Sequence, residues 1–318
     1  MGLSLVPYFI VAGLLLWWFF RRQSTLERHG RVPLLHVSML SIRRLRSGLS
    51  VVAAQYAFTA GLFFMVPIYL QMTLGLNALD TGIRIFPLSI ALILFSMVGT
   101  WLNRSWSPKF IVRIGQLVLI ASSLVLVASV SANLKSVAFG VGMFFAGAAL
   151  GLLASQLGNV NMSSVPEKQS SEAGGLQGVF QNLGSSLGTA LIGSILIASL
   201  GSIFLAGVNP SSLPQSAKTT VVQSTDSGVA IVPASSVPQI AEKAGLSSSD
   251  SSELMGLYQD AQVSSLRISF FALALISGLS LMLSRNIPDT VLTDVRNDEN
   301  EKEEEEEEEE EDKGVPAP

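Results

Sequence analysis

The sequence predicts an all-α transmembrane protein, and three observations carry this prediction. Apolar residues make up 49% of the 318 residues and charged residues only 14%, whereas about a quarter of an ordinary soluble domain is charged. The mean hydropathy is +0.49. The apolar residues also gather in stretches of about 20, the length that a helix needs to cross a bilayer core about 30 Å thick. This composition excludes a soluble enzyme, a nucleic-acid-binding protein and a collagen-like or wholly disordered chain.

The predicted membrane domain covers residues 1–285. Its third span contains Arg84 just inside its start, and its sixth span is polar in its first half. The seven predicted spans are residues 3–20, 48–70, 83–102, 114–132, 136–157, 176–204 and 266–284. An external loop at 205–265 precedes the last span. We expect helix within it at Ser236–Gln262, because serine and aspartate stand where helix caps are useful; an unstructured linker is the alternative.

Charge around the spans predicts their orientation. Arg21 and Arg22 follow the first span, whereas a signal peptide carries its positive charge before the apolar stretch. We therefore expect a retained helix with its N-terminus outside. The loops that this places in the cytoplasm hold 11 Lys and Arg residues, and the outer loops hold 3. The positive-inside rule thus predicts a multi-pass protein of the plasma (inner) membrane with a cytoplasmic C-terminal tail.

The C-terminal tail differs sharply in charge from the rest of the chain. From Arg285 onward there are 15 acidic and 4 basic residues, which leaves 9 acidic and 16 basic residues before it. The nine consecutive glutamates Glu303–Glu311 cannot pair with one another or be buried. Residues 286–318 are therefore predicted to be a disordered acidic tail. A solvated tail without a specific role is the simpler interpretation; divalent-cation binding or folding back on the arginine-rich loop are alternatives.

Residues for catalysis and metal binding are scarce. There is no cysteine, which excludes disulfides, thiolate metal sites and cysteine nucleophiles. His29 and His36 both lie in an arginine-rich loop and are interpreted as solvated residues. No nucleophile–base pair is visible. We therefore expect no enzyme, no catalytic residue, no cofactor and no metal; the expected partners are the lipid bilayer and a small-molecule substrate, with no nucleic acid.

Polar side chains inside the spans mark a candidate substrate path. Polar groups at membrane depth are costly and usually line a cavity or join helices. Those singled out here are Gln55, Tyr56, Gln71, Gln177, Gln181 and Asn182. As a set they favour a polar cavity lining, and interhelical hydrogen bonding is the alternative for each. Close helix packing is predicted by the G-x-x-x-G pairs Gly147–Gly151, Gly174–Gly178 and Gly184–Gly188.

Formal charges within the spans are few. Arg84 and Arg267 stand at span edges, where long side chains reach the headgroups. For Arg84 there are two alternatives, pairing with Asp80 one turn earlier or attracting anionic groups into a cavity. No Asp or Glu lies in the middle of a predicted span. A proton-coupled pump would therefore need its proton-carrying residue in another chain or a missing part.

Four short motifs follow one another along the chain. They are an ER…PLL loop (Glu27, Arg28, Pro33, Leu34, Leu35), a P-x-Y-x-Q span ending (Pro67, Tyr69, Gln71), a G…G…P run (Gly75, Gly82, Pro87) and a glycine-rich span start (Gly174, Gly175, Gln181, Gly184, Gly188). With these motifs, residues 3–285 resemble the C-terminal half of the fourteen-helix drug:proton antiporters of the major facilitator superfamily. The resemblance implies that the seven spans are helices eight to fourteen.

The resemblance also implies a function. It implies a secondary transporter that exports hydrophobic or cationic small molecules by alternating access, with proton coupling supplied by a missing N-terminal half. Conformational or gating candidates are Pro67, Arg84, Pro87 and Arg104. The family's G-x-L-x-D-R-x-G-R-like loop is altered here, with Asn103 for Asp and Trp106 for Gly.

Two readings of the short chain remain open. It is either a fragment of an exporter or a half-transporter that pairs with a separately encoded N-terminal half or with itself. The alternative function is a non-transporting membrane scaffold or regulator that acts through the external loop or the acidic tail.

Overall fold

The computed structural model describes residues 6–29, 31, 33–131, 136–215, 218–219, 221–222, 231–243, 246–287 and 289. Its long helices are α1 (Val6–Arg28), α2 (Arg43–Pro67), α3 (Ala78–Leu102), α4 (Pro108–Ser129), α5 (Ser136–Met162), α6 (Ser170–Val208) and α9 (Ser248–Leu283). Each predicted span overlaps one of them, and the all-α fold is confirmed. Within the described residues, six helices are long and apolar enough to cross a membrane, namely α2 to α6 and α9.

Short elements connect these helices. The 3-10 turns are η1 (Val37–Ser41), η3 (Glu167–Gln169), η4 (Ala234–Ser236) and η5 (Ser284–Asn286). The π-helical segment is η2 (Ile68–Thr73), and the short α-helix before α9 is α8 (Val237–Lys243). Side chains cap several helix starts. Asn77 Oδ1 accepts a hydrogen bond from the backbone N–H of Asp80 at 2.9 Å, and Ser107 and Ser247 cap α4 and α9 in the same way. Each cap satisfies a donor that the first helical turn leaves unpaired.

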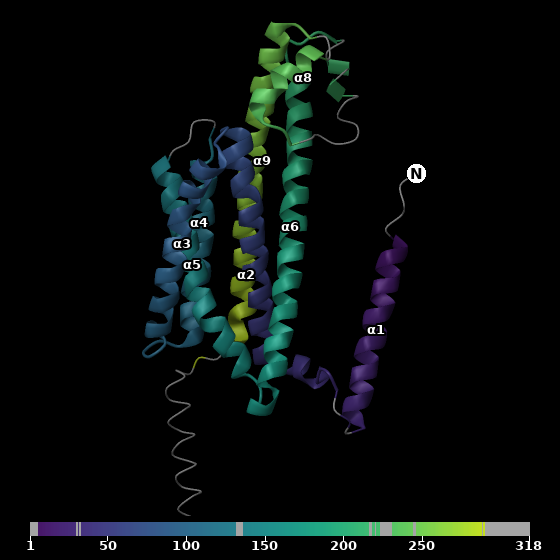
Figure 1. The fold of residues 1–318 in the computed structure, drawn as a ribbon, viewed down its shortest axis with the longest axis vertical. Coiled ribbons are helices and arrows are strands. Elements are labelled where there is room, and N and C mark those ends of the chain that lie inside the picture. The colour runs from purple at the N-terminus through teal and green to yellow at the C-terminus, as the bar shows by residue number, and fades with distance from the viewer. Residues whose placement is uncertain are drawn as a thin grey trace, which may run out of the picture.

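The bundle contains two groups of three helices. Figure 1 shows α3, α4 and α5 together on one side and α2, α6 and α9 on the other. The most extensive packing joins α3 to α5, α2 to α6 and α4 to α5. If α2, α3 and α4 are matched in order with α5, α6 and α9, the α3–α5 pair corresponds to the α2–α6 pair. The correspondence does not extend to every pair, because α6 packs against α9 and no comparable packing joins α3 to α4 within the described residues.

Helix α1 stands apart from this bundle (Figure 1). Its apolar side chains are largely uncovered, with Leu14 60% and Trp17 58% exposed. Its C-terminal end is attached by polar contacts, because Gln23 Oε1 accepts a hydrogen bond from the backbone N–H of Leu34 at 2.9 Å. The following turn, rather than packing along the helix, thus connects α1 to the bundle.

The segment between α6 and α9 forms a small lobe. The two helices continue past the bundle, and α8 lies between their ends (Figure 1). Phe204, Val208, Leu254 and Tyr258 are buried together in an apolar cluster of this lobe. The Tyr258 hydroxyl accepts a hydrogen bond from the backbone N–H of Val232 at 3.0 Å. The expected helical segment Ser236–Gln262 is occupied by α8 and the first turns of α9.

The chain after α9 is packed against the bundle at first. Ile287 is only 2% exposed and belongs to the main apolar cluster. Within the predicted tail, Ile287 is thus packed against the bundle, whereas Asn286 and Asp289 are exposed. The glutamate run lies outside the described residues.

Candidate functional site

Five of the six candidate path residues lie on two neighbouring helices. Gln55 and Tyr56 are on α2, and Gln177, Gln181 and Asn182 are on α6. The two helices run parallel and nearly touch, because a Cβ added to Gly184 or Gly188 would lie 2.2 Å from the carbonyl oxygen of Ala53 or Ala57, respectively.

This glycine contact sets the heights of the candidate residues. Gln181 lies three residues before Gly184, or about 4.5 Å along the helix, at an axial rise of about 1.5 Å per residue. Gln55 lies close to the Gly184 level because its neighbour Ala53 contacts Gly184. Gln71 is 16 residues beyond Gln55, about 24 Å away along the same axis. The structure therefore places Gln55 and Gln181 at similar heights in the bundle and separates Gln71 from both.

Two of the candidate amides are bonded within the protein. The Nδ2 of Asn161 donates a hydrogen bond to Gln177 Oε1 at 2.9 Å, and the Nδ2 of Asn182 donates to the carbonyl oxygen of Gly178 at 2.9 Å. Gln177 therefore takes part in an interhelical hydrogen bond, which was the alternative to its lining a cavity. The cavities beside α1, at the lobe junction and between α3 and α5 are lined by other residues.

Three buried amides that were not singled out as candidates join helices. The Nε2 of Gln116 donates to Ser280 Oγ at 2.8 Å, which links α4 to α9. The Nε2 of Gln156 donates to the carbonyl oxygen of Gly99 at 2.9 Å, which links α5 to α3. Asn161 links α5 to α6 in the same manner, and all three are at most 1% exposed. Gln116 and Gln156 could have been recognised from the sequence, because each is a single amide within an apolar span.

The two proline candidates differ in their surroundings. Pro67 lies next to an irregular segment of its helix, and Pro87 lies within a regular helix. Pro67 ends the regular part of α2, and the π-helical segment η2 follows at once. Proline lacks the N–H that an α-helix needs, and π segments and prolines are the usual places where helices bend. Gly75 then turns the chain toward α3 with φ of 70°, a conformation that favours glycine. Pro87 lies inside α3.

Arg104 is exposed in the turn between α3 and α4. Its neighbours fasten this turn to the chain after α9, because Ser107 Oγ and Lys109 Nζ donate to the carboxylate of Asp289 at 2.9 and 3.1 Å. The hydroxyl of Ser107 and then the ammonium of Lys109 hold the pKa of Asp289 below its usual value.

The alternative in which Asp80 pairs with Arg84 is wrong. Asp80 Oδ2 accepts a hydrogen bond from Asn77 Nδ2 at 2.9 Å, and the two ion pairs among the described residues lie elsewhere. Arg267 also differs from expectation. It donates two hydrogen bonds, of 3.1 and 2.8 Å, to the carbonyl oxygen of Val130, so it secures the end of α4 instead of reaching the headgroups.

His36 is half-buried, and its interpretation as a solvated loop residue is wrong. Its backbone N–H donates to Glu172 Oε2 at 3.0 Å, and its Nδ1 lies 2.9 Å from both carboxylate oxygens. The contact forms because the loop after α1 folds against the start of α6, where Met39 and Leu176 are buried together. The two partners are 136 residues apart, so no local pattern revealed the pair.

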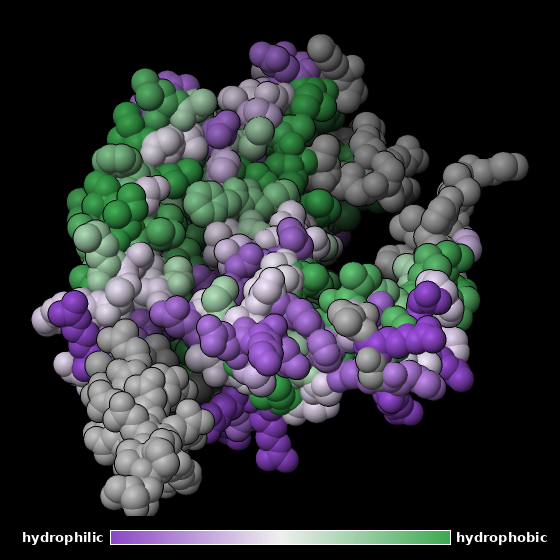
Figure 2. Space-filling view, turned by 60° about the horizontal axis from the view of Figure 1, so that its bottom comes forward, coloured by the Kyte–Doolittle hydropathy of each residue, from purple (hydrophilic) through white to green (hydrophobic). Residues whose placement is uncertain are grey.

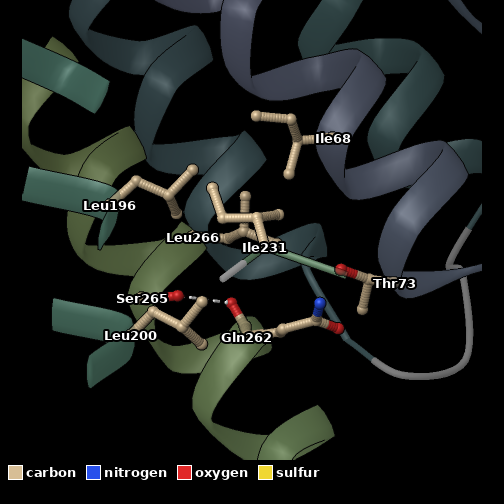
Figure 3. Close-up of a pocket in the computed structure, with 8 residues that line it drawn as sticks. All are labelled: Ile68, Thr73, Leu196, Leu200, Ile231, Gln262, Ser265 and Leu266. Carbon is tan, nitrogen blue, oxygen red and sulfur yellow. Dashed lines mark hydrogen bonds between the residues drawn. The ribbon is translucent and has the colours of Figure 1, made fainter. Parts of the chain in front are cut away.

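Figure 3 shows a small cavity where the lobe meets the bundle. It has a volume of about 10 Å³, roughly the space for one water molecule and far below the several hundred Å³ of a drug-sized site. Thr73 and Gln262 line it, and their Oγ1 and Oε1 atoms are buried without a hydrogen-bond partner. We therefore regard this cavity as a hydration site.

Taken together, the fold defines a class of membrane protein. Six apolar helices in two packed groups of three are the number of helices in one half of many secondary transporters.

The comparison with protein families agrees with this class. Residues 1–189 match the family model described as "Major Facilitator Superfamily". The chain belongs to the major facilitator superfamily.

Curated relatives are longer chains named for transport, export or drug resistance. The chain is 25% identical to the "Probable actinorhodin transporter" of Streptomyces coelicolor, over 58% of this chain and 32% of the relative. It is 29% identical to the "Tetracenomycin C resistance and export protein" of Streptomyces glaucescens, over 56% and 33%. For the "Probable multidrug resistance protein EmrY" of Escherichia coli the identity is 26%, over 59% and 35%. The matched part of this chain thus covers about a third of the length of these relatives.

A solved structure shares the fold. It is a bacterial homolog of the human lysosomal transporter Spinster, in an inward-facing and occupied conformation. The TM-score is 0.51 at 18% identity, and the match covers 76% of this chain and 48% of that chain. The match spans about half of the solved transporter, in keeping with an architecture of one transporter half.

Proposed function

We propose that this chain is the C-terminal part of a secondary transporter that exports hydrophobic or cationic small molecules. The observation that carries the proposal is its membership of the major facilitator superfamily together with relatives named for drug resistance and antibiotic export. Transport in such proteins moves one half against the other around a site near the bilayer midplane. This chain supplies one half, and an N-terminal half in the same polypeptide, in a separate one or in a second copy supplies the other.

The coupling ion in this proposal is the proton, and the proton-carrying residue belongs to the other half. Within the described spans, the acidic side chains lie toward helix ends, as Asp80 does at the start of α3 and Glu172 at the start of α6. An acidic residue at the centre of a span is the usual proton carrier in such transporters. The described spans have no such residue at their centre, so the proposed role of the C-terminal half is to bind substrate and to move against the other half.

The proposed orientation follows from the arginines. Arg21, Arg22, Arg43 and Arg44 all lie at the end of the bundle from which the loop after α1 enters α2. Figure 2 shows a continuous hydrophilic band across this end of the molecule. By the positive-inside rule this end faces the cytoplasm, so the lobe is external. The proposed location is the plasma (inner) membrane.

The test uses the native transporter that contains this chain, in a host that lacks its own exporters. Drug resistance and dye efflux from inverted membrane vesicles are measured for Gln55→Ala and Gln181→Ala, with expression checked by immunoblot. We expect each change to alter efflux or its substrate preference at unchanged expression. Gln239→Ala, the same substitution at an exposed position of α8, is the matched control. If neither variant differs from that control, the candidate path is wrong. If no compound is exported at all, the proposed function is wrong.

A further inference from the structure

A second pocket lies between α3 and α5, away from the candidate path. Its volume is about 420 Å³, and Asp80, Arg84, Pro87 and Phe139 are among its lining residues. It is at the end of the bundle where α3 and α5 begin, which is also the end that carries the lobe (Figure 1). The pocket thus offers one carboxylate and one guanidinium on consecutive turns of a single helix.

The two charged groups remain available to a ligand. Asp80 Oδ2 is held by Asn77 Nδ2 at 2.9 Å, which fixes the carboxylate and leaves its Oδ1 without a hydrogen bond to any described residue. Arg84 is half-buried and forms no ion pair with a carboxylate in the described part of the chain. A ligand that carries a cation and an anion a few ångströms apart matches this arrangement, because each charge meets its opposite.

The depth of these residues matches the headgroup region of a membrane. α3 has 25 residues, about 37 Å at about 1.5 Å per residue, whereas the bilayer core is about 30 Å thick. If the helix is centred, its first two or three residues lie outside the core. Asp80 then stands at the boundary and Arg84 about 6 Å further along the axis, from where its side chain reaches back to the headgroups.

An uncovered apolar stripe begins beside the pocket. Leu79, Ile83, Phe86 and Ile90 are 73%, 60%, 61% and 40% exposed. Their spacing of i, i+4, i+7 and i+11 places them along one face of α3. An acyl chain that descends from a headgroup in the pocket would lie on this stripe.

We propose that the pocket binds the headgroup of phosphatidylethanolamine. The ammonium group donates hydrogen bonds to Asp80, the phosphate accepts hydrogen bonds from Arg84, and an acyl chain covers the stripe. Phosphatidylcholine keeps the two charges but has no N–H to donate, and phosphatidylglycerol keeps the phosphate but has no cation. The site therefore distinguishes the three lipids by chemistry that two side chains supply, and its occupation does not depend on transport.

The experiment titrates the purified, delipidated full chain with the three phospholipids, all with the same acyl chains, and measures bound lipid by native mass spectrometry. We expect phosphatidylethanolamine to bind more tightly than either other lipid. Asp80→Asn should remove its advantage over phosphatidylglycerol, and Arg84→Gln should weaken all three, each by roughly threefold to tenfold, as for one part-exposed charge-assisted hydrogen bond. Arg84→Lys should retain most of the binding, which separates loss of charge from loss of fold.

The matched control is Arg44→Gln, which removes an exposed arginine at the opposite end of the bundle and should bind all three lipids as the unaltered chain does. Equal affinity for the three lipids, or variants at positions 80 and 84 that bind like this control, would overturn the proposal. Soluble glycerophosphoethanolamine is added as a competitor. If it displaces the phospholipid at equal concentration, the ligand is the free headgroup and the lipid assignment is wrong.

Discussion

Single residues at the ends of helices carry much of the specific chemistry of this protein. Arg267 and Tyr69 both bind the chain just after α4, through the carbonyl oxygens of Val130 and Ser131. A helix leaves its last carbonyl groups without partners inside the helix, so donors from other elements stabilise its end. Two residues far apart in the sequence thus hold one turn in place. The residue types alone did not indicate this shared role.

A prediction about pH dependence follows from the contacts of Asp289. The pKa of its carboxyl group is lowered in the folded protein, by Ser107 first and Lys109 second. A lowered carboxyl pKa means that the contact stabilises the fold above the ordinary aspartate pKa and is lost as the pH falls through the lowered value. We expect the segment around Ile287 to be protected from hydrogen exchange at neutral pH, and this protection, measured against the intrinsic exchange rate at each pH, to fall below about pH 4.

In the Asp289→Asn variant this segment should be less protected at neutral pH, and its protection relative to the intrinsic exchange rate should lose most of its pH dependence. Asp260→Asn is the control, because Asp260 is exposed on the lobe part of α9. Slow exchange in the Asp289→Asn protein would contradict the role assigned to the carboxylate.

Among the elements, α6 shows how similar sequence patterns acquire different roles. Its two G-x-x-x-G pairs read alike in the sequence. Gly184 and Gly188 lie against backbone carbonyl oxygens of α2, whereas a Cβ on Gly178 would meet open space and one on Gly174 only the distant end of Met162. The later pair lets α2 and α6 approach closely, and the earlier pair does not.

A prediction follows for this helix pair. Gly188→Ala would place a Cβ 2.2 Å from the carbonyl oxygen of Ala57, so the two helices must separate, at a cost of about 1–3 kcal/mol. Gly178→Ala, in the same helix, should be neutral or slightly stabilising, because alanine is the better helix former by about 1 kcal/mol. Thermal unfolding of the purified proteins in detergent measures both. Equal midpoints for the two variants would show that the close approach does not stabilise the bundle.

At the scale of the whole molecule, the bundle lacks a counterpart within the described residues. Its six apolar helices match in number one half of such a transporter. Apolar side chains remain uncovered on α3, α6 and α9, with Phe86, Leu187 and Leu275 at 61%, 59% and 61% exposed. Lipid or a second half covers these surfaces in the membrane. The proposed function requires the second half.

We therefore expect the working particle in native membranes to have at least about twice the 33.8 kDa of this chain. An antibody against the acidic tail, used on a native gel of mildly solubilised membranes, measures this mass. A denaturing gel of the same sample shows whether the other half belongs to the same polypeptide. A native particle of the chain's own mass would contradict transport by two halves and favour the scaffold alternative. Deleting Asp298–Pro318 then separates the two functions, since only a scaffold that acts through its tail would lose its phenotype.

The sequence by itself determined the fold class, the approximate positions of the helices and the family. These follow from local properties, because a span is recognised from about 20 consecutive apolar residues and a motif from its own spacing. The tertiary structure decided which side chains meet. His36 with Glu172 and Asp289 with Lys109 join distant segments, and Asn161 with Gln177 joins two consecutive helices. The physical reason is that the rotation and height of one helix against another depend on packing over the whole interface, which no single segment encodes.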